Sequence, residues 1–259
     1  MFPSSVADQD RHTAERVFHD LQAAMRATTF RRNPVELRFV DAEYLDHETW
    51  IRPAMTRFGD LHGKSILDYG CGHGMASVVL ARQGAAVTAF DLSPGYVREA
   101  EERAAANGVS VRFVVADGEA LPFPDESFDC VWGNAVLHHL DLAKAGAELK
   151  RVLKPGGVAV FCEPWGGNPL LEFARKHLPY PGKNRTADEQ PLRPGDLGPV
   201  REMFPSLTIE GFQLLSMVRR VWNHRVITSA LDGLDARCLR AAPILTKWCR
   251  YVVLVMTKG

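Results

Sequence analysis

The sequence predicts an α/β protein with a doubly wound, mostly parallel, seven-stranded sheet. Three observations support this fold class. Strand-like and helix-like runs alternate from Lys64 to Glu163, the run Val158–Cys162 is apolar throughout, and a glycine-rich turn separates the first strand from its helix. A strand that is buried on both faces has no polar positions, so this pattern is typical of a parallel sheet covered by helices on both sides.

The elements of this core follow in order along the chain. The first strand is expected over Ser65–Tyr69 and the first helix over Met75–Gln83. Further strands are expected at Ala86–Phe90, Val111–Ala116, Phe128–Asn134 and Val158–Cys162, and further helices at Pro94–Asn107 and Asp141–Leu153. Gly108 and the run Lys154-Pro155-Gly156-Gly157 follow these two helices, and glycine and proline are typical helix stop signals.

The sequence on either side of the core predicts two further regions. Residues 1–63 should form a helical cap, with helices over Val6–Arg26 and Asp46–Phe58. Residues 64–163 would be the ligand-binding core. Residues 164–259 would form a substrate or lid region whose strands, Leu207–Ser216 and Arg250–Thr257, complete the sheet. The polar, Pro/Gly-rich stretch Pro179–Pro199 is either a surface loop or a mobile lid, because loops of this length are often functional.

Composition excludes several classes of protein. The chain has 259 residues, 46% of them hydrophobic, and a formal net charge of zero, so no overall basic field favours a nucleic acid partner. Five scattered cysteines without zinc spacing indicate a reducing, cytoplasmic location. No secretory signal is visible at the N-terminus, and the longest aliphatic run, Tyr251–Met256, is too short to cross a bilayer.

The glycine loop indicates the chemistry of a ligand. Asp68 ends the first strand, and Gly70, Gly72 and Gly74 follow at alternate positions before the helix. A ligand can approach a backbone without Cβ atoms closely, as in nucleotide-binding loops. Asp68 would repel a pyrophosphate, but its charge suits a nucleoside with a cationic tail. S-adenosylmethionine, with an amino group and a sulfonium, fits that description.

Three other strand ends point to the same sheet edge. Asp91 follows the second strand, where a carboxylate can accept both ribose hydroxyls, although an aspartate there is also a common helix cap. Asp117-Gly118 follows the third strand, where it either reads an adenine edge or forms an ordinary Asp-Gly turn. Asn134 ends the fourth strand. The order and spacing of these residues favour one shared site.

These motifs resemble the class I S-adenosylmethionine-dependent methyltransferases, in the small-molecule subgroup similar to the ubiquinone/menaquinone methyltransferases. The resemblance covers roughly residues 64–163 and is weak outside them. The matching segments are Leu67–Gly74, Asp91–Ser93, Asp117–Phe123, Phe128-Asp129, Leu137–Leu140 and Glu148–Gly157.

The resemblance implies a Rossmann-like fold, S-adenosyl-L-methionine as cofactor and a role for each matching residue. Asp68, Gly70, Cys71, Gly72 and Gly74 would contact the methionine moiety. Asp91 would hold the ribose, Leu92 would stack on the adenine, and Asp117 and Gly118 would read its edge. Asn134 would lie near the amino acid tail. A nicotinamide-binding fingerprint is the competing interpretation of the loop, but Met75 stands where its third glycine is required.

Candidates for acceptor chemistry come from the fourth and fifth strand ends. His138 and His139 could act as a base near neutral pH, or could be a packing and turn element. Glu163 could orient a hydroxyl or amine, or cap the following segment. Tyr44 and His47 could close over the cofactor as a lid, and Trp165 could form a wall of the substrate region. No metal site is predicted, because adjacent histidines suit chelation poorly.

The sequence therefore predicts methyl transfer to an O, N or C atom of a small, apolar or aromatic metabolite. Two alternatives remain open. The cofactor could undergo an intramolecular displacement that releases methylthioadenosine, or the protein could bind the cofactor without turnover. Oligomeric state is not predicted.

Overall fold

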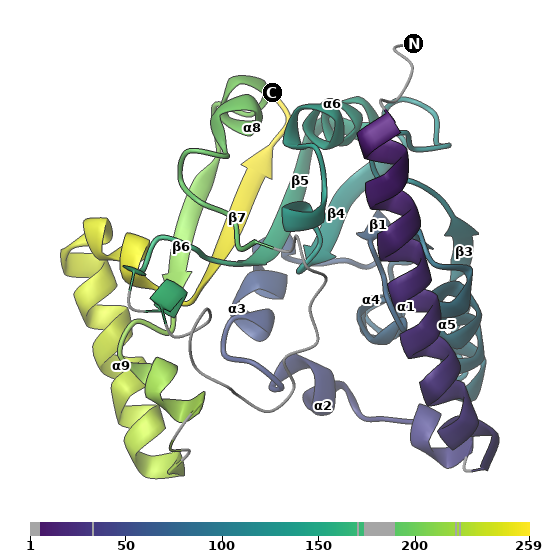
Figure 1. The fold of residues 1–259 in the computed structure, drawn as a ribbon, viewed down its shortest axis with the longest axis horizontal. Coiled ribbons are helices and arrows are strands. Elements are labelled where there is room, and N and C mark those ends of the chain that lie inside the picture. Colours follow the sequence, from purple (N-terminus) through teal and green to yellow (C-terminus); the bar gives the residue numbers. More distant parts are fainter. Residues whose placement is uncertain (1–5, 33, 170, 174–189, 221, 223) are drawn as a thin grey trace.

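The computed structural model describes residues 6–32, 34–169, 171–173, 190–220, 222 and 224–259. In these residues one seven-stranded sheet has the strand order β3-β2-β1-β4-β5-β7-β6. All neighbouring pairs from β3 to β5 are parallel, and β7 is antiparallel to both β5 and β6 (Figure 1). The predicted fold class is confirmed. The polypeptide enters the sheet at β1 near its centre and winds outward in both directions, so the β1–β4 edge is a switch point where such sheets bind ligands.

The described elements have the following bounds. The strands are β1 (Ser65–Tyr69), β2 (Ala86–Asp91), β3 (Arg112–Val115), β4 (Phe128–Asn134), β5 (Leu153–Pro164), β6 (Thr208–Phe212) and β7 (Tyr251–Thr257). The α-helices are α1 (Val6–Arg32), α2 (Asp41–Leu45), α3 (Ile51–Met55), α4 (Met75–Arg82), α5 (Pro94–Ala106), α6 (Leu142–Val152), α8 (Gly198–Met203) and α9 (Arg225–Ala241). The 3-10 helices are η1 (Pro34–Leu37), η2 (Thr56–Phe58), η3 (Leu137–His139), η4 (Ser216–Arg220) and η5 (Pro243–Trp248).

Two predicted helices are wrong in extent. The helix predicted over Val6–Arg26 continues as α1 to Arg32. The segment Asp46–Phe58 is not a single helix: turns occupy residues 46–50, α3 begins at Ile51, and η2 follows it. Pro53 explains the difference. A helix that began at Asp46 would bring the Pro53 ring against the carbonyl of Thr49, whereas proline is tolerated in a first turn. The prediction for Pro179–Pro199 lies mostly outside the described residues.

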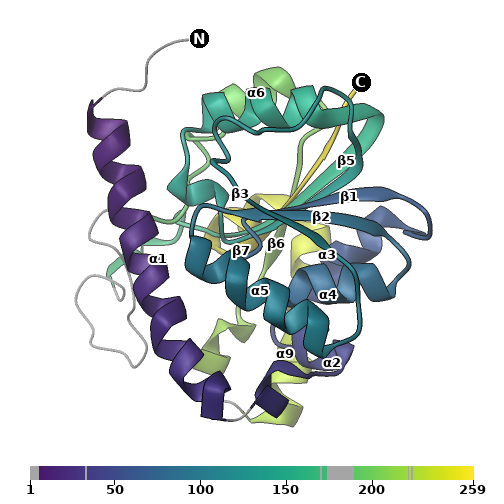
Figure 2. The same ribbon diagram turned by 90° about the vertical axis from the view of Figure 1, so that its right-hand side faces the viewer.

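The two faces of the sheet are covered by different helices, as Figure 2 shows with α6 on one side and α3, α4 and α5 on the other. Side chains alternate accordingly. Leu67 and Phe161 pack into the cluster that includes residues of α6 and α8. Ile66 and Val160, their neighbours along the strands, pack into the cluster of α3 and α4. This alternation places odd- and even-numbered residues of a strand on opposite faces, and strands covered on both sides are therefore apolar throughout.

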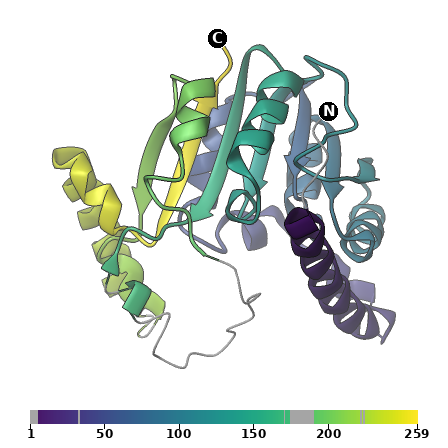
Figure 3. The same cartoon turned by 45° about the horizontal axis from the view of Figure 1, so that its top comes forward.

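Helix α1 lies along the outside of α5, at the opposite side of the molecule from α9 (Figure 3). Asp20 anchors it: its Oδ1 accepts from the Ser93 hydroxyl (2.5 Å) and from the Gly95 N–H (2.9 Å) at the start of α5. A second anchor is the ion pair between Arg26 and Glu99 (3.1 Å), whose carboxylate is only 4% exposed. These contacts set the position of α1 relative to the ends of β1 and β2.

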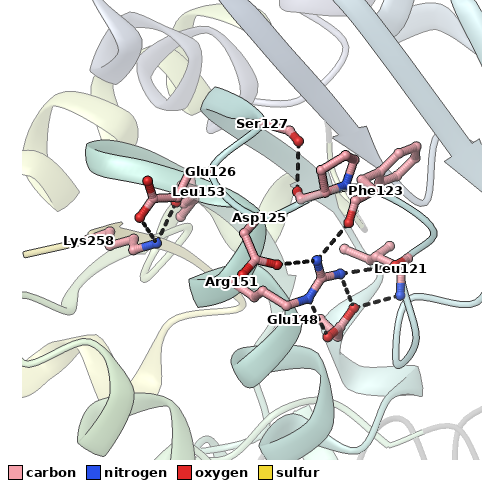
Figure 4. A network of polar contacts seen from close by, with 10 residues as sticks. Leu121, Phe123, Asp125, Glu126, Ser127, Glu148, Arg151, Leu153 and Lys258 are labelled. Carbon is pink, nitrogen blue, oxygen red and sulfur yellow. Dashed lines mark hydrogen bonds and ion pairs between the residues drawn. The ribbon is translucent and has the colours of Figure 1, made fainter.

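Arg151 on α6 fixes the connection that leads into β4 (Figure 4). Its guanidinium donates to the carbonyls of Phe123 (2.6 Å) and Leu121 (3.0 Å) and pairs with Glu148 (2.7 Å) and Asp125 (3.0 Å). A planar guanidinium with five donors can hold several acceptors of one loop at once. The segment from Leu121 to Asp125, which follows the Asp117-Gly118 turn, is thereby tied to α6.

None of the helices in the described part of the chain combines the length and the apolar character needed to cross a membrane.

Candidate functional site

A cavity of about 550 Å³ lies at the carboxyl ends of β1, β2 and β4. Most of the residues predicted to bind a cofactor line it. They are Asp68, Gly70, Cys71, Gly72, Asp91, Leu92, Asp117, Gly118 and Asn134. The cavity has the size of a site for a small molecule or cofactor, a class that spans roughly 300–1,000 Å³.

Two of the carboxylates that line the cavity are buried. Asp68 is 2% exposed and accepts from the Ser77 hydroxyl (2.5 Å). Burial raises its pKa to about 7, helped by the charge of Asp91. Asp91 accepts from the N–H groups of Gly72 (2.9 Å) and Ser93 (2.9 Å), and burial raises its pKa to about 6. Two carboxylates that desolvation forces toward neutrality are suited to a cationic ligand, which would stabilise both charges.

The glycines of the loop have different functions. A Cβ at Gly72 would meet no described atom within 4 Å, so this backbone faces open space beside the cavity. A Cβ at Gly70 would lie 2.6 Å from a methyl group of Val136, and one at Gly74 would lie 2.6 Å from the Cβ of Ala100. Gly74 is also absent from the residues that line the cavity, so its glycine serves the packing of α4 on α5. Of these three glycines, Gly72 provides the space for a ligand.

The adenine and tail ends of the predicted site also have identifiable features. Tyr69 donates its hydroxyl to the Gly118 carbonyl (2.6 Å), which fixes the Asp117-Gly118 turn under the cavity. Asn134 lines the cavity, and no hydrogen-bond partner for its buried Oδ1 exists within the described residues. A buried acceptor without a partner is costly, which indicates that a ligand donor belongs there. These donors and acceptors fit a nucleoside with an amino acid tail.

The predicted acceptor residues separate into two groups. His139, Tyr44 and His47 line the cavity, whereas His138, Glu163 and Trp165 do not. Glu163 is fully buried and accepts from the N–H groups of Val136 (3.0 Å) and Leu137 (2.8 Å). Its other oxygen lies 2.7 Å from His138 Nδ1. Trp165 is 2% exposed and belongs to the hydrophobic core. We therefore assign Glu163 and Trp165 to the support of the site.

Sequence reasoning missed two cavity residues on α1, Glu15 and His19. They stand at i and i+4, a spacing that places side chains on one face of a helix and that could have drawn attention to them. His73 of the glycine loop also lines the cavity, and burial lowers its pKa to about 3. It is therefore neutral in the folded protein.

Burial raises the pKa of the Cys71 thiol well above its usual value, which argues against a reactive thiolate in the loop. The described residues contain no group of three or more histidine, cysteine, aspartate or glutamate side chains arranged to hold a metal ion.

The fold and the site together define an α/β protein with a cavity of cofactor size at the carboxyl edge of its sheet. In the comparison with known proteins, residues 67–161 match the family model described as a methyltransferase domain.

Two curated relatives match within the same region. The 2-methyl-6-phytyl-1,4-hydroquinone methyltransferase of Synechocystis sp. is 42% identical over 42% of this chain and 36% of its own length. The malonyl-[acyl-carrier protein] O-methyltransferase of Pseudescherichia vulneris is 42% identical over 41% of this chain and 41% of its own length. The chain thus spans about two fifths of the length of these relatives.

The similarity to solved structures covers more of the chain. Geranyl diphosphate C-methyltransferase from Streptomyces coelicolor, solved with S-adenosyl-L-homocysteine, matches 81% of this chain and 80% of its own, with a TM-score of 0.54 and 19% identity. At that identity the match shows a shared fold.

Proposed function

We propose that the protein transfers a methyl group from S-adenosyl-L-methionine to a small-molecule acceptor. The observation that carries the proposal is the pair of buried carboxylates, Asp68 and Asp91, beside the open backbone of Gly72 in a cavity of cofactor size. A nucleotide with a pyrophosphate would meet two negative charges there. A ligand with an ammonium and a sulfonium would neutralise them.

Each part of the cofactor has residues suited to hold it. Asp91 would accept from the ribose hydroxyls, and the Asp117-Gly118 turn would read the adenine edge beside Leu92. Asn134 Oδ1 and the charge of Asp68 would face the amino group of the tail, with Gly70, Cys71 and Gly72 as the backbone floor. When bound, the cofactor supplies an electrophilic methyl group on sulfur.

The protein itself would align the acceptor and exclude water. Tyr44 and His47, which come from the N-terminal region, line the cavity together with α1, so residues 1–63 would act as a cap over the core formed by residues 64–163. Holding the acceptor in line with the methyl group supplies much of the rate, because correct orientation replaces a bimolecular encounter. Residues 164–259 would contribute to acceptor choice.

The names of the two curated relatives suggest a hydroquinone or a malonyl thioester as the kind of acceptor. All five cysteines are free, and four are buried, which agrees with a reducing cytoplasm.

The test is a product analysis with methyl-labelled cofactor and a panel of phenolic, amine and carboxylate acceptors. The proposal expects a labelled methyl ether, amine or ester, or a C-methylated product, with S-adenosylhomocysteine in equal amount. Release of methylthioadenosine would support intramolecular displacement instead. Binding without any product across the panel would favour a non-catalytic role. An Asp91→Ala variant controls for methylation that does not use this cavity.

A further inference from the structure

A carboxylate and an imidazole meet at the side of the cavity that α1 covers. His139 Nδ1 lies 3.2 Å from Glu15 Oε1, and both side chains line the cavity. They come from elements that are far apart in the sequence, α1 and η3. The exposed fractions are 16% for His139 and 13% for Glu15, so both groups are mostly shielded but accessible from the cavity. A carboxylate at one ring nitrogen orients the imidazole and determines which nitrogen carries the proton.

The imidazole of His139 packs against a buried pair, His138 and Glu163. The ring of His138 lies against it, with ring centroids 4.0 Å apart. His138 is fixed in turn by Glu163, which also accepts from two backbone N–H groups of the same turn. These contacts tie η3 to the end of β5. Glu163 and His138 therefore support this turn and do not line the cavity.

Glu15 is held in place by the attachment of α1 to α5. Asp20, a little more than one turn further along α1, accepts from Ser93 and Gly95, and Gln22 accepts from the Tyr96 hydroxyl (2.6 Å). The carboxylate therefore reaches His139 from a helix anchored on the core. Rigid support of this kind is what a positioned base requires.

The charge of the cavity limits the acceptors that it can receive. Its described lining includes five acidic residues, and no lysine or arginine. The five are Glu15, Glu43, Asp68, Asp91 and Asp117. The cofactor would neutralise Asp68 and Asp91, so a carboxylate or phosphate acceptor would enter against the charges of the other three, Glu15, Glu43 and Asp117. A neutral acceptor would not be repelled, but a neutral hydroxyl must lose its proton before or during methylation.

We propose that Glu15 and His139 form a carboxylate–imidazole base that selects a neutral acceptor with an ionisable hydroxyl, such as a phenol or hydroquinone. The inference rests on the proposed function and narrows its substrate class. His139 is the residue that contacts the acceptor, and Glu15 is a positioning residue that acts through it.

The acceptor oxygen forms a bond to the methyl carbon while its proton moves to His139 Nε2. The bond between the methyl carbon and sulfur breaks, and its electron pair stays on sulfur. Glu15 accepts the Nδ1–H of the resulting imidazolium, and solvent later removes the extra proton. No oxidant, reductant or metal ion is needed.

The first test needs no turnover. ¹⁵N NMR of the histidine rings in the protein without cofactor reports which nitrogen of His139 carries the proton, with His139→Asn used to assign its signal. We expect the Nδ1–H form in the wild type and a shift toward the Nε2–H form in Glu15→Ala. Glu101→Gln, an exposed carboxylate on α5, is the matched control and should leave the signal unchanged. An unchanged tautomer in Glu15→Ala would overturn the positioning role.

The second test compares kcat/KM for acceptors of different charge and acidity. We expect a neutral phenol to be preferred over a malonyl half-thioester, and its kcat/KM to fall by about 10²–10⁴-fold in His139→Asn. In Glu15→Gln the kcat/KM for the phenol should fall by about tenfold or more, and in Glu15→Asp it should fall by less. With a nitrophenol that is already ionised, Glu15→Gln should show no loss, because no proton remains to be removed.

The outcomes separate this inference from the proposed function. If the wild type binds no cofactor, both fail. If it binds cofactor and methylates phenols but neither variant changes the rate, only the base fails. A preference for the carboxylate acceptor would contradict the argument from charge. Cofactor affinity and thermal unfolding of each variant, measured alongside, distinguish a lost base from a misfolded protein.

Discussion

Cofactor affinity should rise steeply with pH, because the two buried carboxylates of the cavity are partly protonated near neutrality. A cationic ligand favours the ionised forms of Asp68 and Asp91. A group that must be ionised for binding weakens affinity by the factor 1 + 10^(pKa − pH). With a pKa of about 7 for Asp68 and about 6 for Asp91, the factors at about pH 6 are about 11 and about 2. Near pH 8 both approach 1.

The dissociation constant should therefore be about twentyfold larger near pH 6 than near pH 8, a difference of about 1.8 kcal/mol in binding free energy. The assay is calorimetric titration with S-adenosylmethionine across this range. At about pH 6.5 roughly one proton should be released on binding. Titrations in two buffers of different ionisation enthalpy measure that release directly.

Matched variants distinguish the pH effect of the two carboxylates from the ionisation of the ligand itself. Asp68→Asn keeps an acceptor for the Ser77 hydroxyl and should reduce the pH effect to about twofold, the part that Asp91 supplies. Glu101→Gln removes an exposed charge and should keep the full effect. Affinity that does not change between these pH values, with no proton release, would refute the assignment of Asp68 and Asp91 to a cationic ligand.

Three further predictions follow from the packing around the site. Both glycines have a positive φ that strains an alanine, and Gly74→Ala should in addition lose about 1–3 kcal/mol of unfolding free energy, because its Cβ would overlap Ala100. Gly72→Ala has no such overlap, so it should lose less stability and should weaken cofactor binding; denaturant titration and calorimetry compare the two, and an equal loss of stability in both variants would contradict the distinction. Glu163→Ala should lower the free energy of unfolding by about 3 kcal/mol or more, since His138 and two backbone N–H groups lose their acceptor. A stability close to that of the wild type would show that the pair of Glu163 and His138 is dispensable. Arg151→Ala should lower the melting temperature and speed proteolysis at residues 121–127 with cofactor affinity retained, and protection equal to the wild type would argue against its role in holding the loop.

The core of the fold could be predicted from local sequence because its elements are defined by local signals. β1 (Ser65–Tyr69) and β4 (Phe128–Asn134) have the predicted bounds. The residues after these strands meet at one edge because parallel strands place their carboxyl ends together, so most of the predicted cofactor residues share one cavity. Helix capping is equally local: Ser93 caps α5 and Asp141 caps α6 through side-chain oxygens.

The parts that were missed depend on contacts between distant segments. Glu15 reaches the cavity only because α1 packs across α5, and no local pattern specifies that position. The pairing of Glu163 with His138 likewise joins two strand ends, and sequence alone could not show that the carboxylate faces a backbone turn and not the cavity. The glycines at 70 and 74 look equivalent to Gly72 in sequence, and only the neighbours Val136 and Ala100 distinguish them.

The most direct test of the central claim is calorimetric binding of S-adenosylmethionine and S-adenosylhomocysteine to the wild type and to Asp91→Ala. The cavity predicts micromolar binding of both ligands by the wild type. The affinity of the variant should be at least tenfold lower, because the ribose hydroxyls would lose their carboxylate acceptor. A folded wild-type protein that binds neither ligand, or an Asp91→Ala variant that binds both as tightly as the wild type, would contradict the account.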